Sequence, residues 1–300
     1  MLPYWLMETK SGRIHKHMQK PIIGAHVSTA GGLHTVFGRA EKLGIGAVQI
    51  FGSSPRSWRA KMPSKEDIIL FFETRKKSEV GSIFLHAAYL VNIASANEEI
   101  YTYSKQSLID HLSIAELIGA EGVIFHIGSS KGITKKEAIQ KEIDAIKEIL
   151  KKVDGKSKLI MENTAGGGEK IGETFEEFAE LFNGAKTERL GICFDTAHAF
   201  EAGWLTQYSK KEIDSFFSRF DKEIDIKNIL AFHINDSMTD AGSHHDRHEN
   251  IGEGKIGISG FKNFAHETGI EGIPWLLEVP GFDGSGPDKK NVEIIKKLFS

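Results

Sequence analysis

Residues that can bind a metal ion recur along this chain at intervals close to the length of one strand-plus-helix unit. Each ends a short apolar run, and successive members lie 33 to 45 residues apart. They are His86, His126, Glu162, Asp195, His233 and Glu278. A strand and its following helix with their loops take about 30 residues or more, so the spacing predicts one such residue per β/α unit. This pattern favours a fold in which parallel strands end at one common face.

The apolar runs predict eight parallel strands. They are short and rich in branched residues, and they cover 22–26, 47–51, 82–86, 122–126, 158–162, 190–195, 229–233 and 274–278. Segments of helical pattern separate them, among them 64–80, which starts with the capping pair Ser64 and Asp67, and 97–118. Eight alternating units predict an α/β fold, a single (β/α)8 TIM barrel with a metal site at the C-terminal ends of the strands.

Composition limits the classes of protein to which the chain can belong. Its 300 residues suit one large barrel at 21–300, and 40% hydrophobic content is enough for the core. The apolar runs are too short to span a bilayer. Residues 1–20 lack the apolar length of a secretory signal and are expected to be a disordered extension, or to reflect a start codon upstream of Met18. We therefore expect a cytoplasmic protein.

The one cysteine of the chain narrows the metal chemistry. Cys193 lies inside the sixth predicted strand, so the chain can form neither an internal disulfide nor a cysteine-type zinc site. A small buried residue is its expected role. The remaining ligand types are imidazole and carboxylate, which suit zinc or manganese.

Two loop segments add three more candidate ligands. In 195–198 (DTAH), His198 follows a predicted strand end by three residues. In 244–254 (HHDRHENIGEG), Asp246 and His248 lie two residues apart and can face one side of an extended loop. A lone histidine at a strand end is more often structural than a ligand. However, the six strand-end candidates and these three together exceed the need of one or two catalytic zinc ions, each of which takes about three ligands, so the set predicts three ions and a shared carboxylate.

The charge of the chain depends on whether these ions are bound. The formal charge is −3, which does not by itself indicate a nucleic-acid-binding protein. Three divalent ions would reverse its sign and concentrate the added charge in the cleft. The second predicted strand is followed by the basic residues Arg56, Arg59 and Lys61. Such a run usually forms only a solvated surface, so by itself it is weak evidence for DNA binding. Excess positive charge at the site would suit an anionic phosphodiester.

Eight segments of the chain are similar to motifs of the endonuclease IV family of apurinic/apyrimidinic (AP) endonucleases. They span about 21–298 and are IIGAHVSTAGG (22–32), SSPRSWRA (53–60), LHAAYLVNIAS (85–95), FHIGS (125–129), MENTAGGG (161–168), CFDTAHAFEAGW (193–204), FHINDS (232–237) and DRHENIGEG (246–254). The resemblance implies a (β/α)8 barrel with three zinc ions. It also implies a DNA-repair hydrolase that cleaves the phosphodiester 5′ to an abasic site with a metal-bound hydroxide, leaving a 3′-hydroxyl and a 5′-deoxyribose phosphate.

The resemblance also implies how the nine ligands are divided among the ions. The first ion takes His86, His126 and Glu162. The second shares Glu162 as a bridge and takes Asp195, His233 and Glu278. The third takes His198, Asp246 and His248. Glu162 is the expected catalytic residue, zinc is the expected metal, and manganese is an alternative at some sites. His26, which ends the first predicted strand, is left unassigned, with a place beside the ligands as one interpretation.

The partner that the resemblance implies is double-stranded DNA containing abasic sites, bound by a monomer. Arg56 and Tyr89 match loop side chains that enter the duplex at the lesion; an aromatic packed under its loop is the alternative role for Tyr89. The chain departs from the family at Ile127, where proline is usual, at Ala197, where cysteine is common, and at Met238, where lysine is frequent. These differences concern loop geometry and local DNA affinity, because none of the three is an expected ligand.

Two other functions fit part of the pattern. A sugar isomerase or epimerase also places His, Glu and Asp at barrel strand ends, but it needs one or two ions, and Asp246 and His248 would then be superfluous. A DNA-damage sensor without catalytic activity would not need the full ligand set. An assay on duplex DNA with an abasic site, with a panel of sugars as control, separates the three.

Overall fold

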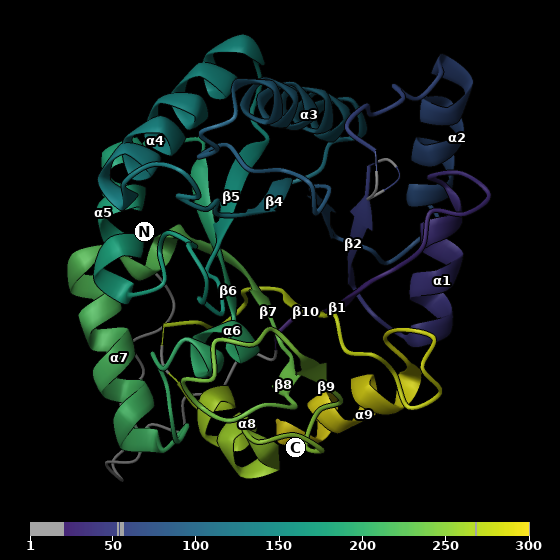
Figure 1. The fold of residues 1–300 in the computed structure, drawn as a ribbon. Coiled ribbons are helices and arrows are strands. Elements are labelled where there is room, and N and C mark those ends of the chain that lie inside the picture. The colour runs from purple at the N-terminus through teal and green to yellow at the C-terminus, as the bar shows by residue number, and fades with distance from the viewer. Residues whose placement is uncertain (1–20, 53, 55–56, 268, 300) are drawn as a thin grey trace, which may run out of the picture.

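The computed structural model describes residues 21–52, 54, 57–267 and 269–299. The predicted extension, 1–20, and Arg56 lie outside the described residues. Eight parallel strands form a closed barrel, in the order β1, β10, β7, β6, β5, β4, β3, β2, and helices surround it (Figure 1). The predicted (β/α)8 barrel is thereby confirmed.

The barrel strands agree closely with the predicted ones. They are β1 (Ile23–His26), β2 (Ala47–Phe51), β3 (Ser82–His86), β4 (Gly122–His126), β5 (Lys158–Glu162), β6 (Leu190–Asp195), β7 (Ile229–His233) and β10 (Trp275–Leu277). The first strand starts one residue later than predicted. The last is shorter by one residue at each end, and it stops before Glu278 because the backbone N–H of Glu278 donates to the side chain of Asn235 at 2.9 Å. Glu278 therefore follows its strand directly instead of ending it.

The helices that the structure describes lie on the outside of the barrel or in its connecting loops. They are α1 (Thr35–Leu43), α2 (Lys65–Arg75), α3 (Glu98–Ile118), α4 (Lys135–Lys152), α5 (Phe175–Ala185), α6 (Thr196–Glu201), α7 (Lys210–Glu223), the 3-10 helix η1 (Ile226–Asn228), α8 (Gly257–Ala265) and α9 (Lys289–Leu298). None of them is long and apolar enough to cross a membrane.

Helix α2 shows how local signals set a helix start more firmly than its end. The predicted capping box is present, since the side chains of Ser64 and Asp67 each accept the other's backbone N–H. The helix ends at Arg75 and not at residue 80, because the backbone N–H groups of Lys77 and Ser78 bond to carbonyls three residues back. These tighter turns direct the chain into β3.

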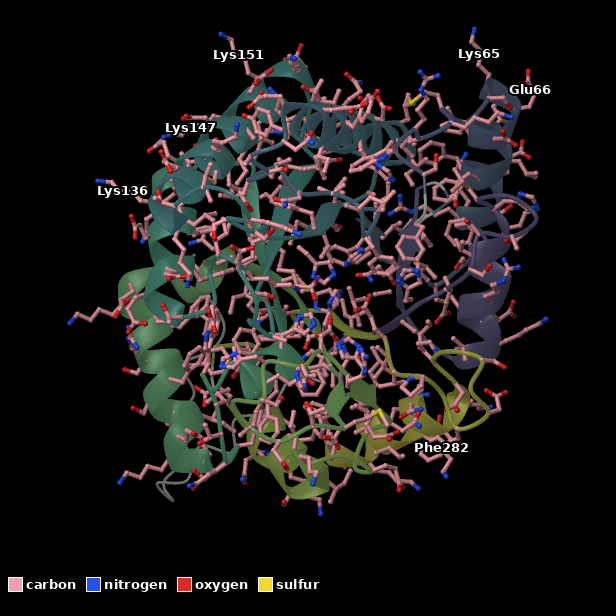
Figure 2. All side chains as sticks on the ribbon, viewed as in Figure 1. Lys65, Glu66, Lys136, Lys147, Lys151 and Phe282 are labelled. Carbon is pink, nitrogen blue, oxygen red and sulfur yellow. The ribbon has the colours of Figure 1, made fainter. Side chains whose placement is uncertain are left out.

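The outer helices separate polar and apolar faces. Lys65 and Glu66 of α2, and Lys136, Lys147 and Lys151 of α4, point away from the barrel (Figure 2). The opposite face of α4 is apolar and buried, and carries Ala138, Ile139, Ile143, Ala145, Ile146 and Ile149. This amphipathic pattern packs the helix against the strands and leaves its charges in water.

Side chains that point into the barrel form two layers. The lower layer is a buried apolar cluster made of Ala47, Phe84, Ile124, Ile160, Cys193, Ala231 and Leu276. Because side chains alternate across a strand, the residue two positions further along faces inward again. That upper layer consists of His26, Gln49, His86, His126, Glu162, Asp195, His233 and Glu278. Burial raises the pKa of Cys193 to about 12, in keeping with its expected role as a small core residue.

A buried carboxyl group lies behind the loop that follows β4. Glu142 of α4 accepts the backbone N–H of Gly128 at 2.9 Å, and its second oxygen has no hydrogen-bond partner among the described residues. Burial raises the pKa of Glu142 to about 8, whereas an unfolded chain ionises such a group near pH ~4.3. Between these values the folded protein holds a proton that the unfolded chain has released, so this group lowers stability as pH rises.

Replacing Glu142 with Gln should remove this dependence. The melting temperature of the variant, relative to that of the unchanged protein, should rise steadily from about pH 5 to pH 8, because Gln has no proton to lose. Thermal unfolding followed by circular dichroism at several pH values measures it. Glu148→Gln, a change at a partly exposed position of the same helix, is the control and should show no such rise. Parallel curves for Glu142→Gln and the unchanged protein would contradict the prediction.

Candidate metal centre

All nine candidate ligands gather at the C-terminal ends of the barrel strands. Three groups place ligand atoms within 4.8 Å of one another. They are His86, His126 and Glu162; Glu162, Asp195, His233 and Glu278; and Asp195, His198 and His248. The first two coincide with the expected ligand sets, and the third brings in Asp195 beside two of its expected members.

Asp246 lies next to this third group, where it was expected. Its carboxylate oxygens are 3.3 Å from His198 Nε2 and 3.6 Å from His248 Nε2. Both of these ring nitrogens are buried, and neither makes a hydrogen bond within the part of the chain that the structure describes. Buried nitrogens without partners, facing a carboxylate, fit a cation bound between them.

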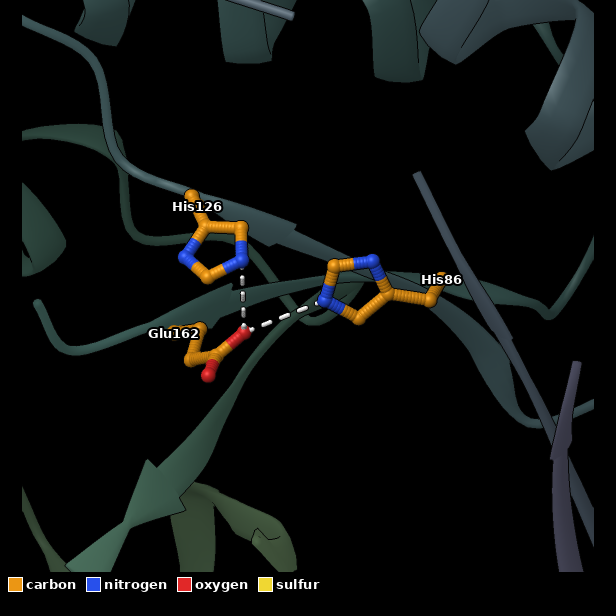
Figure 3. Close-up of side chains that lie close together, drawn as sticks. All are labelled: His86, His126 and Glu162. Carbon is orange, nitrogen blue, oxygen red and sulfur yellow. Dashed lines mark hydrogen bonds and ion pairs between the residues drawn. The ribbon is translucent and has the colours of Figure 1, made fainter. Parts of the chain in front are cut away.

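The Glu162 carboxylate connects the first two groups. Nε2 of His86 and Nε2 of His126 face one of its oxygens, at 3.3 and 3.7 Å (Figure 3). Nδ1 of His233 and Nδ1 of His198 lie 2.9 and 3.3 Å from the other oxygen. The side chain is fully buried. A carboxylate whose two oxygens face separate sets of imidazoles can bridge two ions.

Backbone carbonyls select the ring nitrogens that two of the histidines offer. Nδ1 of His86 lies 2.8 Å from the carbonyl of Ala87, and Nδ1 of His198 lies 2.9 Å from that of Asn163. A carbonyl only accepts, so each Nδ1 carries the proton and donates it. The Nε2 atoms are then left with lone pairs for a metal ion.

Two asparagines that the sequence analysis missed hold the carboxylate ligands. Asn235 donates to Asp195 Oδ2 at 2.7 Å and accepts the backbone N–H of Glu278 at 2.9 Å. The side chain of Asn163 bonds both backbone groups of Asp195, at 2.7 and 3.0 Å. Each asparagine follows a predicted strand-end ligand by one or two residues, and this proximity was the signal available.

The position of His198 follows from helix capping. Asp195 is the N-cap of α6, and its Oδ1 accepts the backbone N–H of His198 at 2.8 Å. Asp195 therefore has two roles, since its second oxygen faces His233 at 3.8 Å and His248 at 3.7 Å. The capping bond places the histidine three residues later over the same site.

A short antiparallel ribbon positions His248. Strand β8 (Asp236–Ser237) pairs with β9 (His248–Glu249), with Ser237 opposite His248. The buried carboxylate of Asp236 accepts three backbone N–H groups from the segment 252–256, at 2.9 to 3.1 Å. The loop that carries His248 is therefore tied to the chain segment that leaves β7.

His26 and Gln49 complete the upper layer without belonging to any ligand group. His26 Nδ1 lies 3.5 Å from Glu278 Oε1, which agrees with a place beside the ligands. Gln49 is fully buried and was not singled out in the sequence. Its signal was a lone polar residue inside the apolar run AVQIF, at the inward register of the strand.

A cavity of about 830 Å³ opens over the metal centre. It is lined by ligands including His86, His126 and His198, and at its edge by Tyr89 and the segment 284–287. Tyr89 is 68% exposed, and its ring meets that of Phe51 edge-on at 5.6 Å. The ring is therefore not packed under its loop and is available to a ligand in the cavity.

The electrostatics of the centre favour bound positive charge. Burial would lower the pKa of His198, but the carboxylates of Asp195 and Asp246 hold it well above its usual value. Burial would raise the pKa of Glu162, but His126 and His233 hold it well below. Burial lowers the pKa of His126 to about 4, which keeps this imidazole neutral and able to bind a metal. The carboxylates of Glu162 and Asp246, whose pKa values are lowered, thus stay ionised and attract cations.

Comparison with known proteins identifies the family. The family model described as a xylose isomerase-like TIM barrel matches residues 37–298. A probable endonuclease 4 from Persephonella marina is 36% identical over 278 residues, which cover 92% of this chain and 96% of that protein. The crystal structure of endonuclease IV from Thermus thermophilus matches with a TM-score of 0.80 and 32% identity, over 93% of this chain and 98% of that one.

A D-tagatose 3-epimerase-like protein shares the fold alone, with a TM-score of 0.70 and 23% identity over 92% of this chain and 96% of that one. Fold and site together place the chain among the xylose isomerase-like TIM barrels with a candidate metal centre at the strand ends. Within that class, it belongs to the endonuclease IV family. The resemblance found in the sequence is thereby confirmed.

Proposed function

We propose that this protein is a DNA-repair AP endonuclease that hydrolyses the phosphodiester 5′ to an abasic site. The products are a 3′-hydroxyl and a 5′-deoxyribose phosphate. Membership of the endonuclease IV family supports an enzyme of this kind. The observation that carries the proposal is the gathering of nine imidazole and carboxylate side chains, the buried Glu162 carboxylate among them, below an open cavity.

The proposed centre holds three zinc ions, with manganese as an alternative at some positions. The first ion is assigned to His86, His126 and Glu162. The second is assigned to Glu162, Asp195, His233 and Glu278. The third is assigned to His198, Asp246 and His248. The Nε2 atoms of His198 and His248, which make no hydrogen bond among the described residues, support a cation in this last set.

The chain's own groups prepare the site for phosphodiester hydrolysis. When bound, such ions lower the pKa of a water molecule and stabilise negative charge on phosphate oxygens. Glu162 is the proposed catalytic residue, because its two oxygens face both sides of the centre and can orient the attacking water. Four ligand carboxylates against three divalent cations leave positive charge in excess, which attracts the phosphate.

Lesion recognition is assigned to the cavity edge. An abasic nucleotide is the easiest to extrude from a duplex because it has no base to unstack, and a cavity of about 830 Å³ has room for it. The exposed ring of Tyr89 stands at the edge, and Arg56 is proposed to act with it. Selectivity then arises from the cost of deforming DNA and not from base readout.

A sugar isomerase or epimerase remains the alternative to test, because such enzymes share this barrel. They need one or two ions, so the third ligand group would have no role in them. An incision assay on abasic duplex, run beside a panel of sugars, tests the proposed function. Turnover of a sugar without incision of DNA would refute it.

We expect about three tightly bound zinc ions per chain. The reason is the number of ligands, which exceeds the need of one or two catalytic ions. Elemental analysis of protein purified without added metal measures the content. A reproducible value near one would contradict the three-ion centre.

Replacing Glu162 with Gln should reduce incision by at least about a hundredfold, because it removes the charge that orients the attacking group. The two side chains have nearly the same volume, so the circular dichroism spectrum should not change. Glu180→Gln, at an exposed position of α5, is the matched control and should incise normally. Normal turnover by Glu162→Gln would refute the role assigned to this residue.

Changing Arg56 and Tyr89 together to Ala should weaken binding to abasic duplex by a few kcal/mol, since side chains wedged into the duplex offset the cost of bending it. The deficit should shrink on a substrate already unpaired around the lesion, and zinc content should stay unchanged. Tyr103→Ala, at an exposed tyrosine of α3, is the control. Equal losses on both substrates, or lost zinc, would show that the two residues support the site instead of opening the DNA.

A further inference from the structure

We infer that Gln49 is a positioning residue of the metal centre, and that its side-chain amide fixes the ring nitrogen that His233 turns toward the ions. The inference rests on the proposed function, because it assumes that the second ligand group binds a metal. It assigns a role to a residue that is neither a ligand nor part of the cavity wall. Its basis is a set of hydrogen bonds that leaves the amide a single orientation.

The amide of Gln49 contacts three groups of the upper layer. Its Nε2 donates to Oε1 of Glu278 and lies 3.0 Å from Nδ1 of His26. Its Oε1 lies 2.7 Å from Nε2 of His233. Gln49 and His233 are both fully buried, so water does not compete for these contacts. Strand β2 therefore contributes an amide that links ligands from β7 and from the end of β10.

The direction of each hydrogen bond follows from the chemistry of the partners. Glu278 belongs to the second ligand group, and a carboxylate binds a metal ion in its ionised form. An ionised carboxylate only accepts, so the NH₂ group of Gln49 faces it. The amide oxygen then faces His233, and this oxygen also only accepts.

The orientation of the amide therefore decides the proton position on His233. The Nε2 atom must carry the proton that is donated to Gln49, and an imidazole that binds a metal ion is neutral and carries only one proton. The Nδ1 atom is left with its lone pair. It faces Glu162 Oε1 at 2.9 Å, Glu278 Oε2 at 3.3 Å and Asp195 Oδ2 at 3.8 Å. The lone pair thus lies among the other members of the second ligand group.

This arrangement differs from that of two other histidines of the ligand groups. Backbone carbonyls fix the rings of His86 and His198, and no side-chain substitution removes a backbone carbonyl. The ring of His233 depends on a side chain, so its support can be removed while the backbone stays in place. A variant at Gln49 should therefore affect the second ion and spare the first.

The test compares Gln49→Met with the unchanged protein. Methionine has a similar length but offers neither an N–H donor nor a strong acceptor. We expect about 10- to 100-fold weaker retention of one zinc ion per chain against a competing chelator, with the other ions retained, as is typical when a group that supports a metal ligand is lost. Zinc released at graded chelator concentrations is the readout and does not depend on activity.

A second readout reports the proton position directly. Long-range proton–nitrogen NMR of protein labelled with ¹⁵N-histidine distinguishes rings protonated at Nδ1 from rings protonated at Nε2. One ring should lose its fixed Nε2–H form in Gln49→Met, whereas a purely structural role would not change this signal. For incision of abasic duplex, kcat should fall while KM stays constant, because Gln49 does not line the cavity.

The control is Ile50→Val, a small change at the next residue of the same strand, which is also fully buried. Loss of zinc in this control equal to that in Gln49→Met would overturn the inference, because it would reveal general damage to the strand. Unchanged zinc retention and an unchanged ring signal in Gln49→Met would overturn it as well. Failure of the unchanged protein to hold three ions or to incise DNA would instead refute the proposed function, so the two failures are distinguishable.

Discussion

A single buried carboxylate, that of Glu162, is the interaction on which the rest of this site depends. Four imidazoles approach its two oxygens at 2.9 to 3.7 Å. Burying an ionised carboxylate costs several kcal/mol unless positive charge lies beside it. The barrel concentrates further carboxylates around the same point, from Asp195, Asp246 and Glu278. Bound cations among the ligands would offset this negative charge, which is how the proposed metal chemistry would support the fold.

Much of this arrangement could be predicted from the sequence, because a parallel barrel repeats one geometric rule. Apolar runs that end in His, Glu or Asp indicated the strands, and side-chain alternation determines which residues face inward. Gln49 obeys the same rule, but an uncharged amide gives no ligand signal. Glu278 was assigned to a strand that ends one residue earlier, since the bond from its N–H goes to Asn235, 43 residues away in sequence. Contacts between distant loops leave no local pattern and depend on the tertiary structure.

The strand ends and the loops contribute differently to specificity. The barrel is shared with a D-tagatose 3-epimerase-like protein, so the fold alone does not define the substrate. The third ligand group of this chain comes largely from loops: His198 follows the capping residue of α6, and His248 lies on the ribbon tied down by Asp236. Under the proposed function, these residues add a third metal position to the barrel, and this addition supports phosphodiester chemistry over sugar isomerisation.

The apolar layer below the ligands closes the barrel on that side of the site. Phe84, Ile124, Ile160 and Leu276 are at most 1% exposed, so the barrel is filled on that side. Within the described part of the chain, a cavity beside Tyr89 opens over the ligands, and under the proposed function DNA binds across it. Ions that enter through this cavity must therefore bind before the duplex covers it. A bound duplex would then cover the ions and slow their dissociation until the product leaves.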